Sequence, residues 1–253
     1  MLPDERYAVI LEEVNRHPAV SIRSLTARLG VSRETVRKDI EILAGQGKLL
    51  QVRGGAAKVV SKEAPMTDRV NTNAEGKIKI ATRVSSMIPE GASIIIDNGS
   101  TTLEVARELV KHRKELQVVT NDLRLAETIA PACREVVLAG GRIDPSEMAT
   151  FGLEVIENLS RYRAEFAIIS AGGLSAHAGL TDFTREAADL RARMLVQAET
   201  ALILADSSKF GVVGQIVMPA PPGRAILISD ADPPADISQV LSELQIDTAH
   251  QSP

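Results

Sequence analysis

The residues best suited to binding an anion follow directly after runs of aliphatic residues. The clearest group is Asp97-Asn98-Gly99-Ser100-Thr101-Thr102, which follows Ile94-Ile95-Ile96 and precedes a predicted helix at residues 103–110. Free backbone N–H groups and the helix dipole both favour an anion such as phosphate at a helix N-terminus. Serine and threonine also cap helices by accepting a backbone hydrogen bond, so this segment alone leaves both interpretations open.

Similar residues follow four other predicted strands. They are Thr120-Asn121, Gly140-Gly141-Arg142, Gly172-Gly173 and Asp206-Ser207-Ser208-Lys209-Phe210. Ligands bind where the carboxyl ends of parallel strands meet, so five such ends would line one crevice. There Lys209 can pair with an anion, while Asp97 or Asp206 can accept from sugar hydroxyls. Turns are rich in these residue types in any case, but that alternative explains one turn better than five.

A second group of residues suits DNA. Ser32 can cap a helix whose Val36, Ile40 and Leu43 share one apolar face. The other faces carry polar and basic side chains in the first turns, where a groove-bound helix reaches base edges and phosphates. We assign DNA contacts to Arg33, Thr35, Arg37 and Lys38.

The neighbouring segments indicate a winged helix-turn-helix. A shorter helix at residues 21–29 ends at Gly30, which suits the left-handed conformation that closes a helix before a turn. Residues 48–59 are predicted to form two short strands around Arg53-Gly54-Gly55. These glycines allow close approach to a sugar-phosphate backbone, with Arg53 or Lys58 supplying charge, and an ordinary hairpin is the alternative.

Charge is divided unevenly along the 253 residues. The formal charge is −4, but residues 1–62 carry 11 Lys and Arg against 7 Asp and Glu, and the remainder carries 18 against 26. The basic part coincides with the predicted DNA-binding part, and an acidic second domain can hang away from the duplex. We predict a DNA-binding domain at residues 1–60, a linker at 61–73, a ligand-binding domain at 74–246 and a disordered polar tail at 247–253.

The second domain alternates aliphatic strands with amphipathic helices. Nearly continuous aliphatic runs indicate strands that are buried on both faces, as in a parallel sheet covered by helices. The sequence therefore predicts an α/β domain. Strands are expected at residues 93–97, 117–120, 135–139, 166–170, 200–205 and 225–229, and helices at 4–16 in the first domain and at 74–88 and near 237–244 in the second.

Several classes of protein are disfavoured. No apolar run is long enough to span a bilayer, and the charged N-terminus lacks the apolar core of a signal peptide, so a cytoplasmic protein is expected. The single Cys133 allows no intramolecular disulfide and is expected to be a small buried residue rather than a nucleophile. The four histidines lack metal-ligand spacing, so neither a metal nor another cofactor is predicted.

Together these motifs resemble the DeoR family of bacterial transcriptional regulators over nearly the whole chain. The N-terminal signature is matched by residues 32–40, Leu49 and the wing, and the C-terminal signature by residues 97–102, 120–121, 140–141, 179–181 and 204–210. The resemblance implies a winged helix-turn-helix joined to a sensor domain with the fold of ribose-5-phosphate isomerases and CoA transferases. It also implies a phosphorylated sugar or related metabolite that usually relieves repression.

Two positions depart from the family pattern. Asn98 stands where Ser or Gly is common, and Arg191 and Arg193 replace the more usual adjacent Lys-Arg pair. These arginines point to different helix faces, so we expect only Arg191 to face the crevice. The predicted effector-binding residues are Asp97, Gly99, Ser100, Thr101, Thr102, Asn121, Gly140, Gly141, Asp182, Arg191, Asp206 and Lys209.

The sequence therefore predicts a repressor of a carbohydrate-metabolism operon. It would bind repeated or palindromic operators as a symmetric homo-oligomer, and a sugar phosphate would compete with DNA. A sugar-phosphate isomerase is the alternative, because such enzymes share the sensor fold and Asp97, Asp182, Glu186 or Asp206 could act as a base. A DNA-reading half has no purpose in a plain isomerase, so no catalytic residue is assigned.

Overall fold

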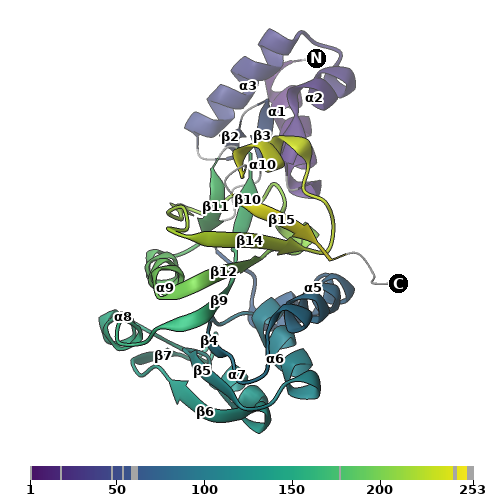
Figure 1. The fold of residues 1–253 in the computed structure, drawn as a ribbon. Coiled ribbons are helices and arrows are strands. Elements are labelled where there is room, and N and C mark those ends of the chain that lie inside the picture. The colour runs from purple at the N-terminus through teal and green to yellow at the C-terminus, as the bar shows by residue number, and fades with distance from the viewer. Residues whose placement is uncertain are drawn as a thin grey trace.

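The computed structural model describes residues 2–17, 19–46, 48–52, 54–57, 62–176, 178–241 and 244–249. The N-terminal helices form one end of the molecule, and the rest is built around a large parallel sheet (Figure 1). Arg53 and Lys58, which the sequence assigns to the wing, lie outside the described residues.

The N-terminal part is a winged helix-turn-helix, as predicted. Its helices are α1 (Pro3–Arg16), α2 (Ile22–Leu29) and α3 (Arg33–Gly45). Its antiparallel sheet contains, in spatial order, β1 (Ala19–Ser21), β3 (Gly55–Ala57) and β2 (Leu50–Val52). The sequence did not predict β1, because three residues between two helices are too few to show the alternation that indicates a strand.

A small apolar core joins the three N-terminal helices. Ile10 of α1 and Val36, Ile40 and Leu43 of α3 are each at most 1% exposed. Burying side chains of this size contributes about 1.5 to 3 kcal/mol each, which is the main force holding the helices together. Gly30 has a φ of 64°, so it ends α2 in the left-handed conformation that glycine adopts at no steric cost.

The larger part is an α/β domain around a parallel sheet, which confirms the predicted fold class. Every neighbouring pair in the sheet is parallel. The strands from edge to edge are β15 (Gln245–Thr248), β14 (Arg224–Ser229), β12 (Ala198–Leu204), β9 (Ala164–Ser170), β4 (Ser93–Ile96), β5 (Leu116–Thr120) and β6 (Cys133–Leu138). The direction of strand succession reverses between β4 and β9, and this reversal is where open α/β sheets bind ligands.

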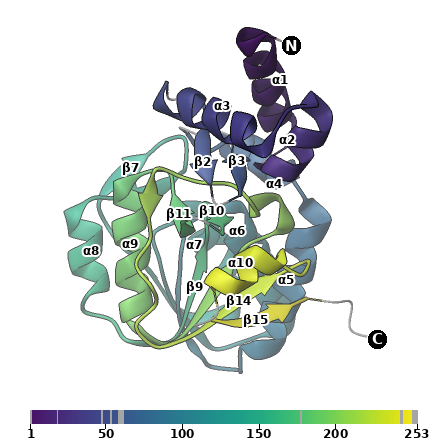
Figure 2. The ribbon, with the colours of Figure 1, turned by 90° about the horizontal axis from the view of Figure 1, so that it is seen from above.

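Helices cover both faces of this sheet (Figures 1 and 2). Ile94 and Ile96 of β4 pack in one apolar layer, and Ile95 packs in the other. All three are at most 1% exposed, which confirms the prediction of strands buried on both faces. The first layer is formed with α5 (Ala74–Met87), α6 (Ser100–His112) and α7 (Leu123–Ile129), and the second with α8 (Leu153–Leu159) and α9 (Arg185–Val196).

Smaller elements complete the second domain. A three-stranded antiparallel sheet begins just after the carboxyl end of β9, and a separate antiparallel pair of strands follows β6. The small sheet contains β10 (Gly173–Ser175), β11 (Gly179–Asp182) and β13 (Ile216–Val217), and the pair contains β7 (Arg142–Asp144) and β8 (Ala149–Phe151). The remaining helices are α4 (Met66–Asn71), α10 (Ala235–Val240), and the short 3₁₀ helices η1 (Ala130–Ala132) and η2 (Ser207–Lys209).

The predicted linker contains a helix. Residues 66–71 form α4, although this stretch is too short to show helical periodicity in the sequence. Its C-terminal end is held by Lys77 of α5, whose Nζ donates to the carbonyl oxygens of Arg69 and Thr72. These bonds satisfy carbonyl groups that a helix end leaves without partners, so a tertiary contact stabilises α4.

The prediction of a disordered tail from residue 247 was wrong for its first residues. Asp247 and Thr248 belong to β15, which pairs in parallel with β14. Arg83 of α5 also donates to the Asp247 carboxylate, with 2.7 Å between Nη2 and Oδ2. Backbone pairing and this ion pair order the segment, whereas its polar side chains alone suggested a tail. Residues 250–253 lie outside the described residues.

Candidate functional site

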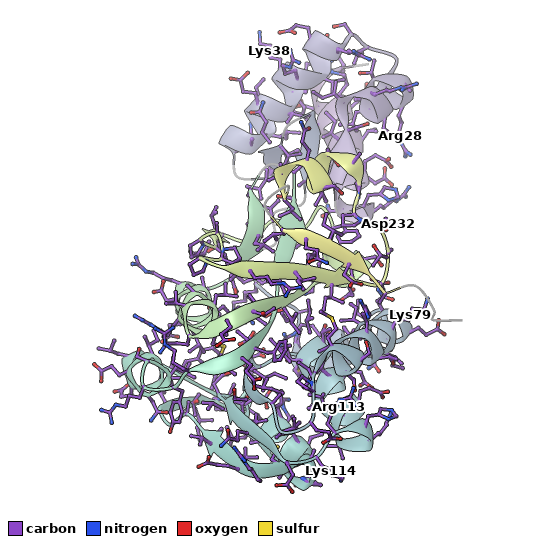
Figure 3. The ribbon with its side chains drawn as sticks, viewed as in Figure 1. Arg28, Lys38, Lys79, Arg113, Lys114 and Asp232 are labelled. Atoms are coloured by element: carbon purple, nitrogen blue, oxygen red, sulfur yellow. The ribbon has the colours of Figure 1, made fainter. Side chains whose placement is uncertain are left out.

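Helix α3 presents exposed basic side chains outside its apolar face. Ser32 caps the helix as predicted, because its Oγ accepts from the backbone N–H of Thr35 at 3.1 Å. Arg33, Arg37 and Lys38 are exposed. Figure 3 shows Lys38 at the end of the molecule that the N-terminal helices form. Three cations in the first two turns of an exposed helix match the needs of groove binding.

Two ion pairs fix the other helices against α1. Asp39 of α3 accepts two bonds from the guanidinium of Arg6, at 2.6 Å from Nε and 2.9 Å from Nη2. Glu13 of α1 lies 2.8 Å from Nη1 of Arg28 on α2. Sequence reasoning missed both pairs, although an acid beside the apolar stripe of the helix was a signal for Asp39. The pair between Arg6 and Asp39 orients α3 without using any of the side chains predicted to contact DNA.

Two adjoining cavities lie at the carboxyl end of the parallel strands. The larger has a volume of about 330 Å³ and a wall with five acidic and two basic side chains. The smaller has a volume of about 160 Å³ and a wall with more cations than anions. Glu63 and Phe183 line both cavities, so they form the partition between them.

Five of the predicted effector-binding residues line these cavities. Asp182 and Arg191 line the larger cavity, and Ser100, Asp206 and Lys209 line the smaller one. Parallel strands bring these residues together, because their carboxyl ends share one edge of the sheet. Arg193, the other arginine of α9, is half-buried and lines neither cavity.

Arg191 is the centre of a buried ion cluster. Its Nε donates to Oδ2 of Asp97 at 2.6 Å, and its Nη1 donates to Oδ2 of Asp182. The three side chains are each at most 3% exposed. Asp97 therefore reaches the larger cavity only through Arg191, and it holds the guanidinium rather than lining the cavity itself.

The cluster shifts the ionisation of its members. Burial raises the pKa of Asp97 to about 6, and the charge of Arg191 offsets this increase only in part. Burial opposes the charged form of Arg191, but the carboxylates of Asp182 and Asp97 raise its pKa well above the ordinary value. Arg191 is therefore always a cation, and the acid that changes charge near neutral pH is Asp97.

The smaller cavity carries the features of an anion site. Arg69, Lys77 and Lys209 are in its wall, together with Ser100 in the first turn of α6. The N-cap residue of α6, Gly99, makes no side-chain capping bond, so the helix end keeps backbone N–H donors for a ligand. Burial lowers the pKa of Lys77, whose ammonium is bonded to two carbonyl groups. Lys209 is the cation better placed to meet a ligand.

Asp206 supplies an acceptor beside these cations. Its Oδ1 accepts from Nδ2 of Asn73 at 3.2 Å and from the backbone N–H of Ser208 at 3.0 Å. Its Oδ2 is buried and has no hydrogen-bond donor in the described part of the chain. A buried carboxylate oxygen without a donor destabilises the folded state, and a hydroxyl group that donated to it would remove this cost.

Three other predicted effector residues are buried and do not line either cavity. Thr101, Thr102 and Asn121 are at most 1% exposed. Thr102 Oγ1 donates to the carbonyl of Gly99 at 3.0 Å, and Asn121 exchanges hydrogen bonds with Asn98. Asn98, which departs from the family pattern, lines the larger cavity and uses its amide in this pairing.

The two glycines that follow β6 are exposed and line neither cavity. A Cβ at Gly141 would come within 2.4 Å of Val155 Cγ2 and 2.9 Å of the carbonyl oxygen of Phe151. Gly141 therefore permits close packing of this turn against β8 and α8. Effector contacts of Gly140 and Gly141 remain predictions.

Sequence reasoning missed the contribution of the segment before the sheet. Glu63, Arg69 and Lys77 come from the linker, α4 and α5, and all three line the smaller cavity. The available signals were a basic residue, Arg69, in the predicted linker and a lysine, Lys77, in the first turn of the helix predicted at residues 74–88. Across the described residues, no group of three or more histidine, cysteine or acidic side chains is arranged to hold a metal ion. A membrane-spanning helix needs about 20 apolar residues, and no helix in the described ranges meets that requirement.

Two family models match separate parts of the chain. Residues 6–62 match the DeoR-like helix-turn-helix domain, and residues 72–231 match the DeoR C terminal sensor domain. The glycerol-3-phosphate regulon repressor of Escherichia coli is 30% identical over 97% of this chain and 98% of its own length. The transcriptional repressor GlcR of Bacillus subtilis is 32% identical over 83% of this chain and 82% of its own. Among solved structures, ribose 5-phosphate isomerase A of Methanocaldococcus jannaschii is similar over 55% of each chain, at 16% identity and a TM-score of 0.40.

A winged helix-turn-helix joined to a ligand-binding α/β domain defines a ligand-responsive transcriptional regulator. The chain belongs to the DeoR family of these regulators. It is a regulator and not an enzyme, because the relatives that it matches over most of their length are transcriptional regulators. The isomerase alternative is therefore set aside.

Proposed function

We propose that this protein represses an operon for the use of a phosphorylated sugar or polyol, and that the same class of metabolite weakens its binding to DNA. The observation that carries the proposal is the cation-rich smaller cavity beside the acidic larger cavity at the carboxyl end of the sheet. Relatives named as repressors of a glycerol-3-phosphate regulon support the chemical class.

The two cavities suit the two ends of such a ligand. Lys209 and the N-terminus of α6 would hold the phosphate, because a point charge and free N–H groups both favour an anion. Asp206 Oδ2 would accept from a hydroxyl next to the phosphate. The acidic wall of the larger cavity, with Asp182, would accept from hydroxyls further along the ligand.

The DNA contacts are proposed for Arg33, Thr35, Arg37 and Lys38 on α3, with the protein acting in the cytoplasm as a symmetric homo-oligomer on a two-fold or repeated operator. Exposed ion pairs are weak, so the contact between Arg37 and Glu34 at 3.5 Å would be exchanged readily for a DNA phosphate or base.

The test uses fluorescence anisotropy of the protein on labelled DNA from upstream of its own gene. The DNA is titrated at fixed salt, with and without a panel of phosphorylated sugars and polyols and their unphosphorylated counterparts. One phosphorylated compound should change the DNA affinity while its dephosphorylated form does not. Binding no tighter than to random DNA under every condition would refute the proposal.

Two variants separate the two sites. Arg37→Ala should weaken operator binding by about 1 to 3 kcal/mol and leave metabolite binding unchanged. Lys209→Ala should abolish the metabolite response and leave operator binding unchanged. Arg16→Ala and Lys111→Ala are matched controls, because both side chains are exposed and lie outside the two proposed sites.

A further inference from the structure

Glu63 is a linker residue whose side chain is packed against the sensor domain. Residues 62–65, which we call the linker segment, lead into α4. Lys62 and Glu63 line the larger cavity, and Glu63 and Ala64 line the smaller one. The side chain of Glu63 is 23% exposed, so most of its surface contacts the protein. The segment that joins the two domains is therefore part of the wall of the proposed effector site.

The carboxylate of Glu63 meets two cations of that site. Its Oε1 lies 2.9 Å from Nη1 of Arg69 and 3.6 Å from Nζ of Lys209. The first distance is a close ion pair. The second is too long for a hydrogen bond, so Lys209 keeps its donors for another anion. Arg69 is held in place from the other side by Glu147, at 2.6 Å between Nη2 and Oε1.

The charges around the smaller cavity are better balanced for a phosphate without Glu63. The wall carries three cationic side chains, Arg69, Lys77 and Lys209, and two anionic ones, Glu63 and Asp206. Glu147 of the larger cavity adds a third anion, because its carboxylate pairs with Arg69. With Glu63 in place the net charge of this group is zero, and without its carboxylate the net charge is one positive. A phosphate monoester carries about −1.5 to −2 at neutral pH, so the second state suits it better.

We infer that Glu63 is an internal competitor of the effector phosphate, and this inference rests on the proposed function. In the ligand-free protein its carboxylate holds the linker segment on Arg69 and lies beside the charge of Lys209. A phosphate offers more charge and three oxygens to the same cations, and it also reaches the N–H groups of α6, so it displaces the carboxylate. Binding of the effector thereby releases the linker segment.

Release of Glu63 reaches the DNA-binding domain through the length of the chain. Ala57, the last residue of β3 in the wing, is six residues before Glu63. Six residues span at most about 20 Å, so attachment of Glu63 to the sensor domain restricts where the wing can lie. Loss of that attachment lets the two domains change their relative position. The competition at Glu63 is thus a direct route from effector binding to a change in DNA affinity.

The test measures binding of inorganic phosphate to the full-length protein at constant ionic strength. Affinity is obtained from the rise of Tm with phosphate concentration, because a ligand that binds only the folded state stabilises it. Glu63→Gln should bind phosphate about three- to tenfold more tightly than the wild type, since a competing ion pair is removed. Glu157→Gln is the matched control, because it removes the same charge from an exposed side chain of α8 that lines neither cavity.

Hydrogen exchange of the peptide that contains the linker segment gives a second readout. In the wild type, phosphate should speed exchange of the backbone amides of residues 62–64, since Pro65 has no backbone N–H. In Glu63→Gln, exchange should already be fast and should not respond to phosphate. Glu63→Asp keeps the negative charge but shortens the side chain by one methylene, so its carboxylate lies further from Arg69. If exchange is fast in this variant too, the contact with Arg69 holds the linker segment, and the charge alone does not. The Tm of each variant without phosphate shows whether it is folded.

The outcomes distinguish this inference from the proposed function. If Lys209→Ala abolishes phosphate binding but Glu63→Gln binds phosphate like the wild type and linker exchange never responds, Glu63 is no competitor and the phosphate site stands. If phosphate stabilises neither the wild type nor Glu63→Gln, the phosphate site itself is wrong, and the role of Glu63 is rejected with it.

Discussion

The buried carboxyl group of Asp97 couples the stability of the sensor domain to pH. Burial raises its pKa to about 6 in the folded protein, and Arg191 compensates only in part. In the unfolded chain the same carboxyl group ionises at about pH 3.9. The folded state therefore binds this proton more tightly than the unfolded state. The resulting stabilisation is fully present below about pH 4 and is lost as the pH rises through about 6.

The substitution Asp97→Asn isolates this effect, because asparagine resembles the protonated acid at every pH. We expect the free energy of unfolding of the variant, relative to the wild type, to increase by about 2 kcal/mol between about pH 4.5 and about pH 7.5. Urea denaturation across this range measures the difference. Asp189→Asn, an exposed acid on α9, is the control and should give a flat difference. A flat difference for Asp97→Asn as well would show that Asp97 has an ordinary pKa.

Helix α3 has two sides with separate tasks. Val36, Ile40 and Leu43 pack into the N-terminal core, while Lys38 is exposed on a different face. If Lys38 contacts a DNA phosphate, each such contact releases about 0.9 of a counterion. Lys38→Ala should therefore lower the slope of log K against log salt concentration by about 0.9 for each phosphate contacted, on specific and random DNA alike.

This prediction is checked by anisotropy titrations on both DNAs at several salt concentrations. Arg16→Ala, with its exposed side chain on α1, should leave the slope unchanged. A loss of affinity for the operator alone, with the slope intact, would assign Lys38 to base recognition instead of phosphate contact.

The orientation of α3 depends on the pair between Arg6 and Asp39. Asp39 is 3% exposed and accepts two hydrogen bonds from Arg6. Asp39→Asn removes the negative charge of this buried pair, so the charge of the Arg6 guanidinium is no longer balanced. We expect a lower Tm and weaker operator binding, because α3 loses its attachment to α1. Glu12→Gln, which removes the partner of exposed Arg16, should change neither. Equal effects of the two substitutions would mean that the Asp39 pair has no special role in orienting the helix.

Elements of this fold could be predicted where a few neighbouring residues determine them. Gly30 ends α2 and Ser32 begins α3 through local backbone chemistry, and Ile94-Ile95-Ile96 shows burial on both faces by its composition. The role of Glu63 could not be predicted, since its partner Lys209 is brought near only by the folded sheet. For the same reason the short strands of the small sheet and β15, which depend on pairing with distant segments, were missed.

The whole molecule must connect a DNA surface at one end with a ligand site on the large sheet. If effector and operator favour different arrangements of the two domains, the coupling between them is reciprocal. The factor by which the effector weakens operator binding must equal the factor by which the operator weakens effector binding. Couplings of this kind are typically about 1 to 3 kcal/mol, or about 5- to 150-fold.

This equality can be measured once the panel identifies the effector, by anisotropy of the operator with and without effector and by calorimetry of the effector with and without operator. Glu63→Gln should reduce both factors together. The linker segment is already released in this variant, so effector binding changes the arrangement of the domains less than in the wild type. Arg37→Ala should weaken operator binding but keep the ratio of affinities, since α3 is fixed within its own domain. If the two factors differ in the wild type, effector and operator act on separate populations, such as different oligomers, and not on one arrangement of domains.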